Sequence, residues 1–165
     1  MFTENLRGTL LRLRKPFLKD SSYWKVGNYL ALNKQPFHQV NGQVLTEPTL
    51  EQTELFYDLE KNEESLIWSI ERLNDEKYLG LISVDKKDDN IFQLEIYVDN
   101  LEVSAKTISF EAISLALDYL SHKKKVKTVV AICNSKYYVL RNVLIQCGFS
   151  LISEEGEVCN FKLSL

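Results

Sequence analysis

The sequence is short of glycine. Its 165 residues contain six glycines, whereas average usage of about 7% would give roughly twelve. The six lie far apart, so no two of them can share a G-x-G-x-x-G loop or a G-x-x-x-x-G-K-[ST] loop. The two commonest glycine-rich phosphate-binding loops are therefore excluded.

Other residues that would mark a class of protein are scarce too. The three cysteines include no C-x-x-C pair and the two histidines are isolated, so we expect packed thiols and no metal site. Twenty basic and 23 acidic residues leave a net charge of −3, which gives no reason to expect a nucleic-acid or membrane partner. No apolar run approaches the roughly 18 residues that span a bilayer, and the N-terminus lacks a signal-peptide core. We therefore expect a cytoplasmic protein.

The N-terminal third predicts one strand and two helices. Thr9–Arg14 is expected as a strand, since a proline follows it closely. A helix is expected over 20–30, capped by Asp20 or the serine after it, and a second over 49–59, where a capping-box pattern starts. The loop between them, at 35–47, is either a wall of a substrate site or an ordinary surface loop.

Three antiparallel strands follow, at Leu66–Leu73, Tyr78–Val84 and Ile91–Val98, separated by turn residues. The third strand alternates in character. One face carries Phe92, Leu94, Ile96 and Val98, and the other carries Gln93, Glu95 and Tyr97.

One β-α-β crossover comes next. A helix over Val103–Ser121 leads into an apolar strand at Val126–Cys133, which we expect to be covered on both faces and parallel to Ile91–Val98. Two parallel strands in an otherwise antiparallel sheet can splay apart at their ends. The N-terminus of the helix between them then points at the opening, ready to receive an anion.

The chain closes with a helix over Lys136–Gln146, with Gly148 as its C-terminal cap, and a hairpin of Phe149–Ile152 and Asn160–Leu165. The predicted fold class is mixed α/β (α+β). Its mostly antiparallel sheet has about seven strands, a splay between two parallel central strands, and helices on both faces.

Several local strings occur in a family-specific order. They are LRLRKPFLKD at Leu11–Asp20, SLIWSIERLNDEKYLGLISV at Ser65–Val84, FEAISLALDYL at Phe110–Leu120, and VVAI at Val129–Ile132 followed by Gly148 and Phe149. Together they resemble the GNAT-type N-acetyltransferases, in particular the branch that acetylates N-terminal amines of ribosomal proteins. The resemblance implies one domain over 1–165 that moves an acetyl group from acetyl-CoA to a primary amine of a peptide, protein or small molecule. The alternative is a catalytically silent GNAT-fold module that binds a partner or forms a homodimer.

The resemblance implies acetyl-CoA as co-substrate, bound in the splay with its pyrophosphate at the N-terminus of the long helix. The family's [RQ]-x-x-G-x-[GA] loop falls on Ser104, Thr107 and Ser109, which all depart from it. The main-chain N–H groups of this loop can still bind a phosphate. The serine and threonine hydroxyls and the Lys106 charge add further groups that could do so. The alternative is a plain helix cap. The implied cofactor-binding residues are Ile96 and Val98 by their main chain, Ser104, Ala105, Lys106, Thr107, Ile108, Ser109 and Tyr137.

The resemblance also implies catalytic residues. Glu95 is the candidate base, with Tyr97 on the same strand face, and the alternative is a paired or solvated sheet residue. Many relatives use a tyrosine as the acid, but Leu144 occupies that position here. Tyr138 or Tyr137, at the start of the same helix, is the remaining candidate. These tyrosines could equally fill the groove of the pantetheine arm, and no metal ligand is implied.

Overall fold

The computed structural model describes residues 4–17, 20, 29–31, 39–40, 43–44, 65–99 and 105–165. The helix expected over 49–59, most of the helix expected over 20–30, and Ser104 lie outside these residues. The expected loop at 35–47 contributes only a small two-stranded hairpin, β4 (Gln39–Val40) with β5 (Gln43–Val44).

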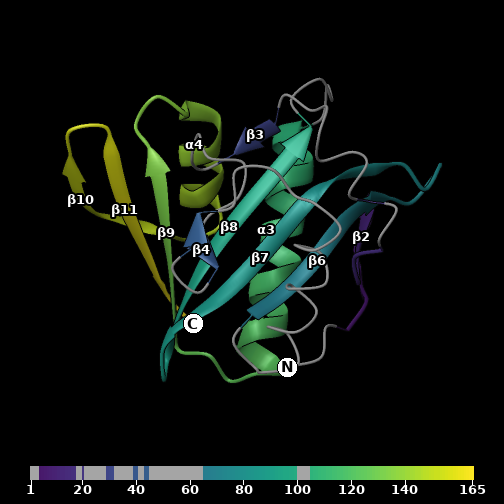
Figure 1. Cartoon of the computed structure of the whole chain (residues 1–165), viewed down its shortest axis with the longest axis horizontal. Helices are drawn as coiled ribbons and strands as arrows, with labels where there is room; N and C mark the ends of the chain where they lie inside the picture. Colours follow the sequence, from purple (N-terminus) through teal and green to yellow (C-terminus); the bar gives the residue numbers. More distant parts are fainter. Residues whose placement is uncertain are drawn as a thin grey trace.

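A mixed sheet forms the centre of the molecule (Figure 1). Its strands are β1 (Leu6–Arg7), β2 (Leu11–Arg14), β3 (Tyr29–Ala31), β6 (Ser65–Arg72), β7 (Tyr78–Asp88), β8 (Ile91–Asp99), β9 (Thr128–Asn134), β10 (Ser150–Glu155) and β11 (Val158–Ser164). The order is β1-β2-β6-β7-β8-β9-β11-β10, with β3 paired to β8 off this path. Among the described strands only β8 and β9 pair in parallel, which confirms the predicted mixed sheet with one parallel central pair.

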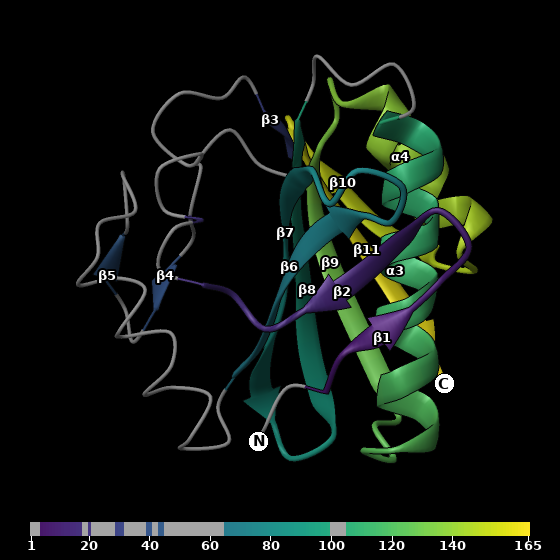
Figure 2. The ribbon, with the colours of Figure 1, turned by 90° about the vertical axis from the view of Figure 1, so that its right-hand side faces the viewer.

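The two described helices pack on the same face of this sheet (Figure 2). They are α3 (Ala105–His122) and α4 (Tyr138–Gln146), and both match their expected ranges within two residues. Gly148 follows α4 with a φ of 95°, as expected of its C-terminal cap. The helices expected on the other face fall outside the described residues, and β4 and β5 lie on that side of the sheet (Figure 2).

The apolar core lies between the sheet and the two helices. Alternate residues of the strands point toward the helices and form one side of this core. Residues on the inner sides of α3 and α4 form the other. The alternation predicted for β8 is confirmed, because all four of its expected core residues are buried there. The core includes Leu11, Leu13, Leu66, Trp68, Ile70, Ile82, Val84, Phe92, Leu94, Ile96, Val98, Ile108, Ala112, Ile113, Ala116 and Leu120.

Two expectations about local structure are wrong. Tyr29 and Leu30, expected at the end of a helix, lie in strand β3, because the backbone of β3 pairs with Tyr97–Asp99 of β8 and this tertiary pairing overrides the local pattern. β9 is not covered equally on both faces. Its buried residues alternate with half-buried ones, since the described helices cover only one face of the sheet.

The cysteines are packed thiols, as expected. Cys133 and Cys159 are fully buried opposite each other on β9 and β11, Cys147 is half-buried, and all three are free. Burial raises the pKa of the Cys133 thiol to about 12, so this thiol stays protonated and unreactive at neutral pH.

Gly80 of β7 is required by a close approach of the neighbouring strand. A Cβ at this position would lie 1.9 Å from the carbonyl oxygen of Tyr97 on β8. We expect Gly80→Ala to lower the free energy of unfolding by about 1–3 kcal/mol, because the strands must separate to admit the methyl group. Urea unfolding checks this. Gly156→Asn is the control, since the turn there is open, with no atom within 4 Å of an added Cβ, and asparagine tolerates its positive φ. Equal midpoints for Gly80→Ala and the wild type would contradict the expectation.

Candidate active site

The parallel strands β8 and β9 open into a wedge. They pair only where Ile91–Gln93 lies beside Thr128–Val130, and beyond that point they diverge (Figure 1). This confirms the predicted splay. At the mouth of the wedge, Val98 pairs with Leu30 of β3. Because β7 occupies the other edge of β8 up to Val98, β3 uses the wedge edge. Within the described strands, the stretch of that edge left to a ligand is Leu94–Ile96.

The N-terminus of α3 borders a cavity of about 540 Å³, lined by Lys106, Thr107, Phe110 and Gln146. Lys106 and Thr107 are exposed and the ring of Phe110 is 40% exposed. The N–H groups in the first turn of a helix have no hydrogen-bond partner within the helix. Those at the start of α3 can therefore attract an anion. A phosphate group could bind the Lys106 ammonium, the Thr107 hydroxyl and the N-terminus of α3. A flat ring could stack on the face of Phe110.

The other residues expected at this helix terminus point elsewhere. Ile108 and Ser109 are buried on the inner side of α3, and the Ser109 hydroxyl donates a hydrogen bond of 2.7 Å to the carbonyl oxygen of Ala105. The structure therefore does not bring the Ser109 hydroxyl to the cavity, because the i−4 carbonyl of its own helix captures it. Ala105 is itself buried, so it can offer a ligand only its main chain.

Glu95 lies on the polar face of β8, opposite the helices. It is 2% exposed, and both of its carboxylate oxygens accept hydrogen bonds of 2.9 Å, one from Gln93 Nε2 and one from the Tyr97 hydroxyl. Burial and the neighbouring Glu95 charge raise the pKa of Tyr97 well above its usual value, so Tyr97 stays protonated and donates. The sheet thus fixes a buried carboxylate beside the wedge.

The two candidate tyrosines of α4 lie on the helix side. Tyr138 is 70% exposed at the first position of α4, and Tyr137 is half-buried against the core as the residue before it. Glu95 faces the other side of the sheet, so the structure does not place it beside these tyrosines. The wedge between β8 and β9 separates the two groups.

The side chains of Ile96 and Val98 are fully buried in the apolar core. A ligand could therefore meet only the main chain of these two residues. Of the two, Ile96 lies on the stretch of β8 that faces the wedge without a described partner strand, while Val98 is paired with β3.

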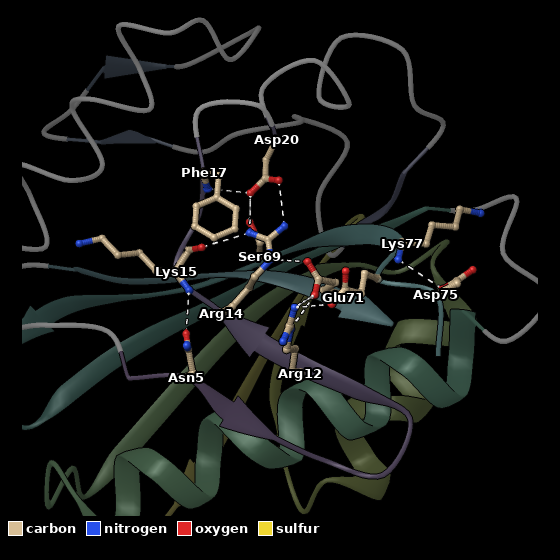
Figure 3. Close-up of polar contacts among 11 residues, drawn as sticks. Asn5, Arg12, Arg14, Lys15, Phe17, Asp20, Ser69, Glu71, Asp75 and Lys77 are labelled. Carbon is tan, nitrogen blue, oxygen red and sulfur yellow. Dashed lines mark hydrogen bonds and ion pairs between the residues drawn. The ribbon is translucent and has the colours of Figure 1, made fainter. Parts of the chain in front are cut away.

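A second polar cluster lies on the same face, over β2 and β6 (Figure 3). We call Arg12, Arg14, Asp20, Ser69 and Glu71 the Arg14 cluster. Arg14 binds Asp20 through two hydrogen bonds of 2.9 and 3.0 Å, and its Nε donates to Glu71. Ser69 donates to Asp20 at 2.7 Å and Arg12 donates to Glu71 at 2.6 Å. Burial lowers the pKa of Arg14, but the hydrogen bonds to Asp20 and Glu71 outweigh it and raise the pKa overall.

This cluster gives Asp20 a role beyond the one expected of it. Its carboxylate also accepts the main-chain N–H of Phe17 at 2.8 Å. The described partners lie in β2, in the turn after it and in β6, so Asp20 anchors this turn to the sheet. The helix that Asp20 was expected to cap lies outside the described residues, so the cap stays a prediction. The buried guanidinium of Arg14 captures the carboxylate, because an ion pair there satisfies both charges.

Sequence patterns missed several residues of this region. Alternation placed Gln93 on the same strand face as Glu95, but it did not indicate that the Gln93 amide donates to this carboxylate. Ser83 lies opposite Glu95 on β7, but strand register decides this and no local pattern indicates it. Phe110 and Gln146 meet only through the packing of α3 on α4.

Comparison with known proteins identifies the fold. A family model described as an acetyltransferase (GNAT) domain matches residues 11–150. The chain belongs to this GNAT acetyltransferase family. Acetyl-CoA is the acetyl donor of GNAT enzymes, and the expected resemblance and fold class are confirmed. A comparison with curated protein sequences finds no match.

Solved structures are similar to this GNAT domain at low identity. RimJ of Mycobacterium smegmatis in complex with CoA-disulfide has a TM-score of 0.72 at 12% identity, covering 98% of this chain and 86% of that one. Spermidine N-acetyltransferase of Vibrio cholerae, in complex with CoA and spermine, has a TM-score of 0.71 at 14% identity, covering 94% and 95%. Ribosomal-protein-S5-alanine acetyltransferase of Vibrio fischeri has a TM-score of 0.71 at 13% identity, covering 98% and 96%.

The described residues contain neither a membrane-spanning helix nor a metal site. Neither α3 nor α4 is long and apolar enough to cross a membrane. Among the described residues, no group of histidine, cysteine, aspartate and glutamate side chains could hold a metal ion.

Proposed function

We propose that this GNAT domain is an acetyl-CoA-dependent N-acetyltransferase that acetylates a primary amine. The observation that carries the proposal is the buried Glu95 carboxylate, held at both oxygens on the strand that forms one wall of the wedge. A base is needed there because an amine arrives protonated and must lose a proton before it can attack.

The donor fits the helix side of the wedge. Lys106, Thr107 and the first N–H groups of α3 would bind its phosphates, and the exposed ring of Phe110 and the amide of Gln146 suit its adenine. Acetyl-CoA supplies the activated thioester. The main chain at Ile96 would bind the thioester oxygen or the arm of the donor, while Ser104 stays a prediction outside the described residues.

The reaction divides between the two sides of the sheet. One proton of the acceptor ammonium goes to Glu95, the freed amine forms a C–N bond to the acetyl carbon, and the C–S bond breaks. The nitrogen releases its second proton to solvent once the C–N bond has formed, and the departing thiolate takes up one proton in its turn. Tyr138 or Tyr137 would deliver a proton to that sulfur from the helix side and be reprotonated from solvent. The acceptor identity, the cytoplasmic location and a homodimer stay predictions.

Lys106→Ala, which removes the Lys106 charge, is expected to weaken acetyl-CoA binding about three- to tenfold. The effect is modest because an exposed cation at a helix N-terminus contributes little to binding a phosphate. Isothermal titration calorimetry measures the change. Lys123→Ala, which removes the same charge just beyond the other end of α3, is the matched control and should bind as the wild type does. Equal dissociation constants for all three proteins would remove Lys106 from the donor site.

Thermal unfolding with acetyl-CoA separates the enzyme from the silent module. At a concentration about 100 times the dissociation constant, a bound donor adds about 2.7 kcal/mol of stability. Stabilisation by acetyl-CoA supports the proposal. No shift at millimolar acetyl-CoA would favour a GNAT-fold module that has lost its donor.

A further inference from the structure

Ser83 is buried directly opposite Glu95. The two residues are cross-strand partners in the β7–β8 register, and both face away from the helices, because Ile82 and Val84 on either side of Ser83 lie in the apolar core. Directly opposed side chains in such a pair have Cβ atoms about 4.5–5.5 Å apart. A hydroxyl and a carboxylate therefore flank one point of this face.

The Ser83 hydroxyl has no hydrogen-bond partner in the part of the chain that the structure describes. Ser83 is 5% exposed, so this hydroxyl is buried. A buried hydroxyl without a partner costs stability, so most such groups are satisfied. The other buried serines follow this rule: Ser65 binds Asp85, Ser69 binds Asp20 and Ser109 binds a main-chain carbonyl.

A ligand with N–H groups would satisfy this position. The hydroxyl oxygen of Ser83 can accept a hydrogen bond, and the Glu95 carboxylate attracts positive charge. Gln93 and Tyr97 hold that carboxylate from along its own strand, and Ser83 is its cross-strand partner on β7. A primary ammonium carries three donors around one nitrogen and matches such a pair.

We propose that Ser83 and Glu95 together form the seat of the acceptor's ammonium group, with Ser83 Oγ accepting one N–H and Glu95 receiving the proton that the nitrogen gives up. The seat rests on the proposed function and adds to it the residue that holds the acceptor. Ser83 keeps its own proton throughout and takes no part in bond making. It is thus a binding residue of the acceptor, and Glu95 is the base.

Ser83→Ala tests the seat by a pair of opposite effects. Removing a hydroxyl without a partner leaves thermal stability equal or higher, whereas the acceptor KM rises about tenfold through loss of a hydrogen bond to a charged group. The affinity for acetyl-CoA does not change. The acceptor used is whichever amine turns over fastest in a panel of a peptide N-terminus, N-α-acetyl-lysine, spermidine and glucosamine.

Ser69→Ala is the matched control. This buried serine of the same face has a partner in Asp20, so its loss lowers stability and leaves the acceptor KM unchanged. An unchanged acceptor KM in Ser83→Ala, with the wild type active, would overturn the seat alone. A wild type that acetylates no amine of the panel would overturn the proposed function and the seat with it.

Discussion

Replacing Glu95 by glutamine is expected to lower kcat by about 100-fold or more, which is the usual contribution of a general base. Glutamine has nearly the same shape and can still accept the hydrogen bond from Tyr97, so folding and acetyl-CoA binding should persist. The amide cannot take a proton from the acceptor. Steady-state rates at saturating acetyl-CoA and amine measure the loss, and circular dichroism verifies the fold.

Asp85→Asn is the control for this substitution. Asp85 lies on the same polar face, opposite Gln93 on β7, so the change removes the same charge near the site without touching Glu95. We expect its kcat to stay within a fewfold of the wild type. Full turnover by Glu95→Gln would show that the carboxylate is a structural member of the sheet, which is the alternative reading of this residue.

Replacing Asp20 by alanine is expected to lower the free energy of unfolding by about 3–5 kcal/mol, the usual cost of breaking a buried ion pair. The guanidinium of Arg14 is 5% exposed and, among the described residues, would keep Glu71 as its one charged partner. Ser69 and the N–H of Phe17 would lose their acceptor as well. Urea unfolding gives the change from the shift in midpoint at constant slope.

The chain offers an exposed pair of the same chemistry as the control. Arg72 and Asp75 form two hydrogen bonds of 2.9 and 2.7 Å, and the hydrogen bond from Arg72 lowers the pKa of Asp75 to about 2. Asp75 is solvent-exposed, so water replaces the lost partner and Asp75→Ala should change stability little. Equal losses for Asp20→Ala and Asp75→Ala would contradict the anchoring role of the Arg14 cluster.

The fold could be predicted where one periodicity dominates. β8 alternates without interruption from Phe92 to Val98, and α3 repeats its apolar residues every three to four positions, so both were correctly placed. Prediction failed at Tyr29, at Leu30 and at the faces of β9. There, partners distant in the sequence decide the outcome, namely the edge of β8 and the side on which α3 and α4 pack.

The candidate site could be predicted only along single strands and helices. Alternation placed the acidic side chain of Glu95 on the polar face of the expected strand Ile91–Val98, and the same pattern brings Gln93 and Tyr97 to it. The partner across the sheet, Ser83, depends on strand register. The family loop that lacks glycine here falls at the start of α3, where the sequence could not show that Lys106 lines the cavity and that Ser109 is buried in the core, because side-chain packing decides both.

The most direct test of the central claim is acetyl transfer itself. The purified protein is incubated with acetyl-CoA and the amine panel, the amines are examined by mass spectrometry, and free CoA thiol is titrated in parallel. We predict one acetyl group on a primary amine for each thiol released, with the product strongly reduced in Glu95→Gln. Acetyl-CoA that is neither bound nor consumed with any amine would contradict the account and leave a GNAT fold without acetyltransferase activity.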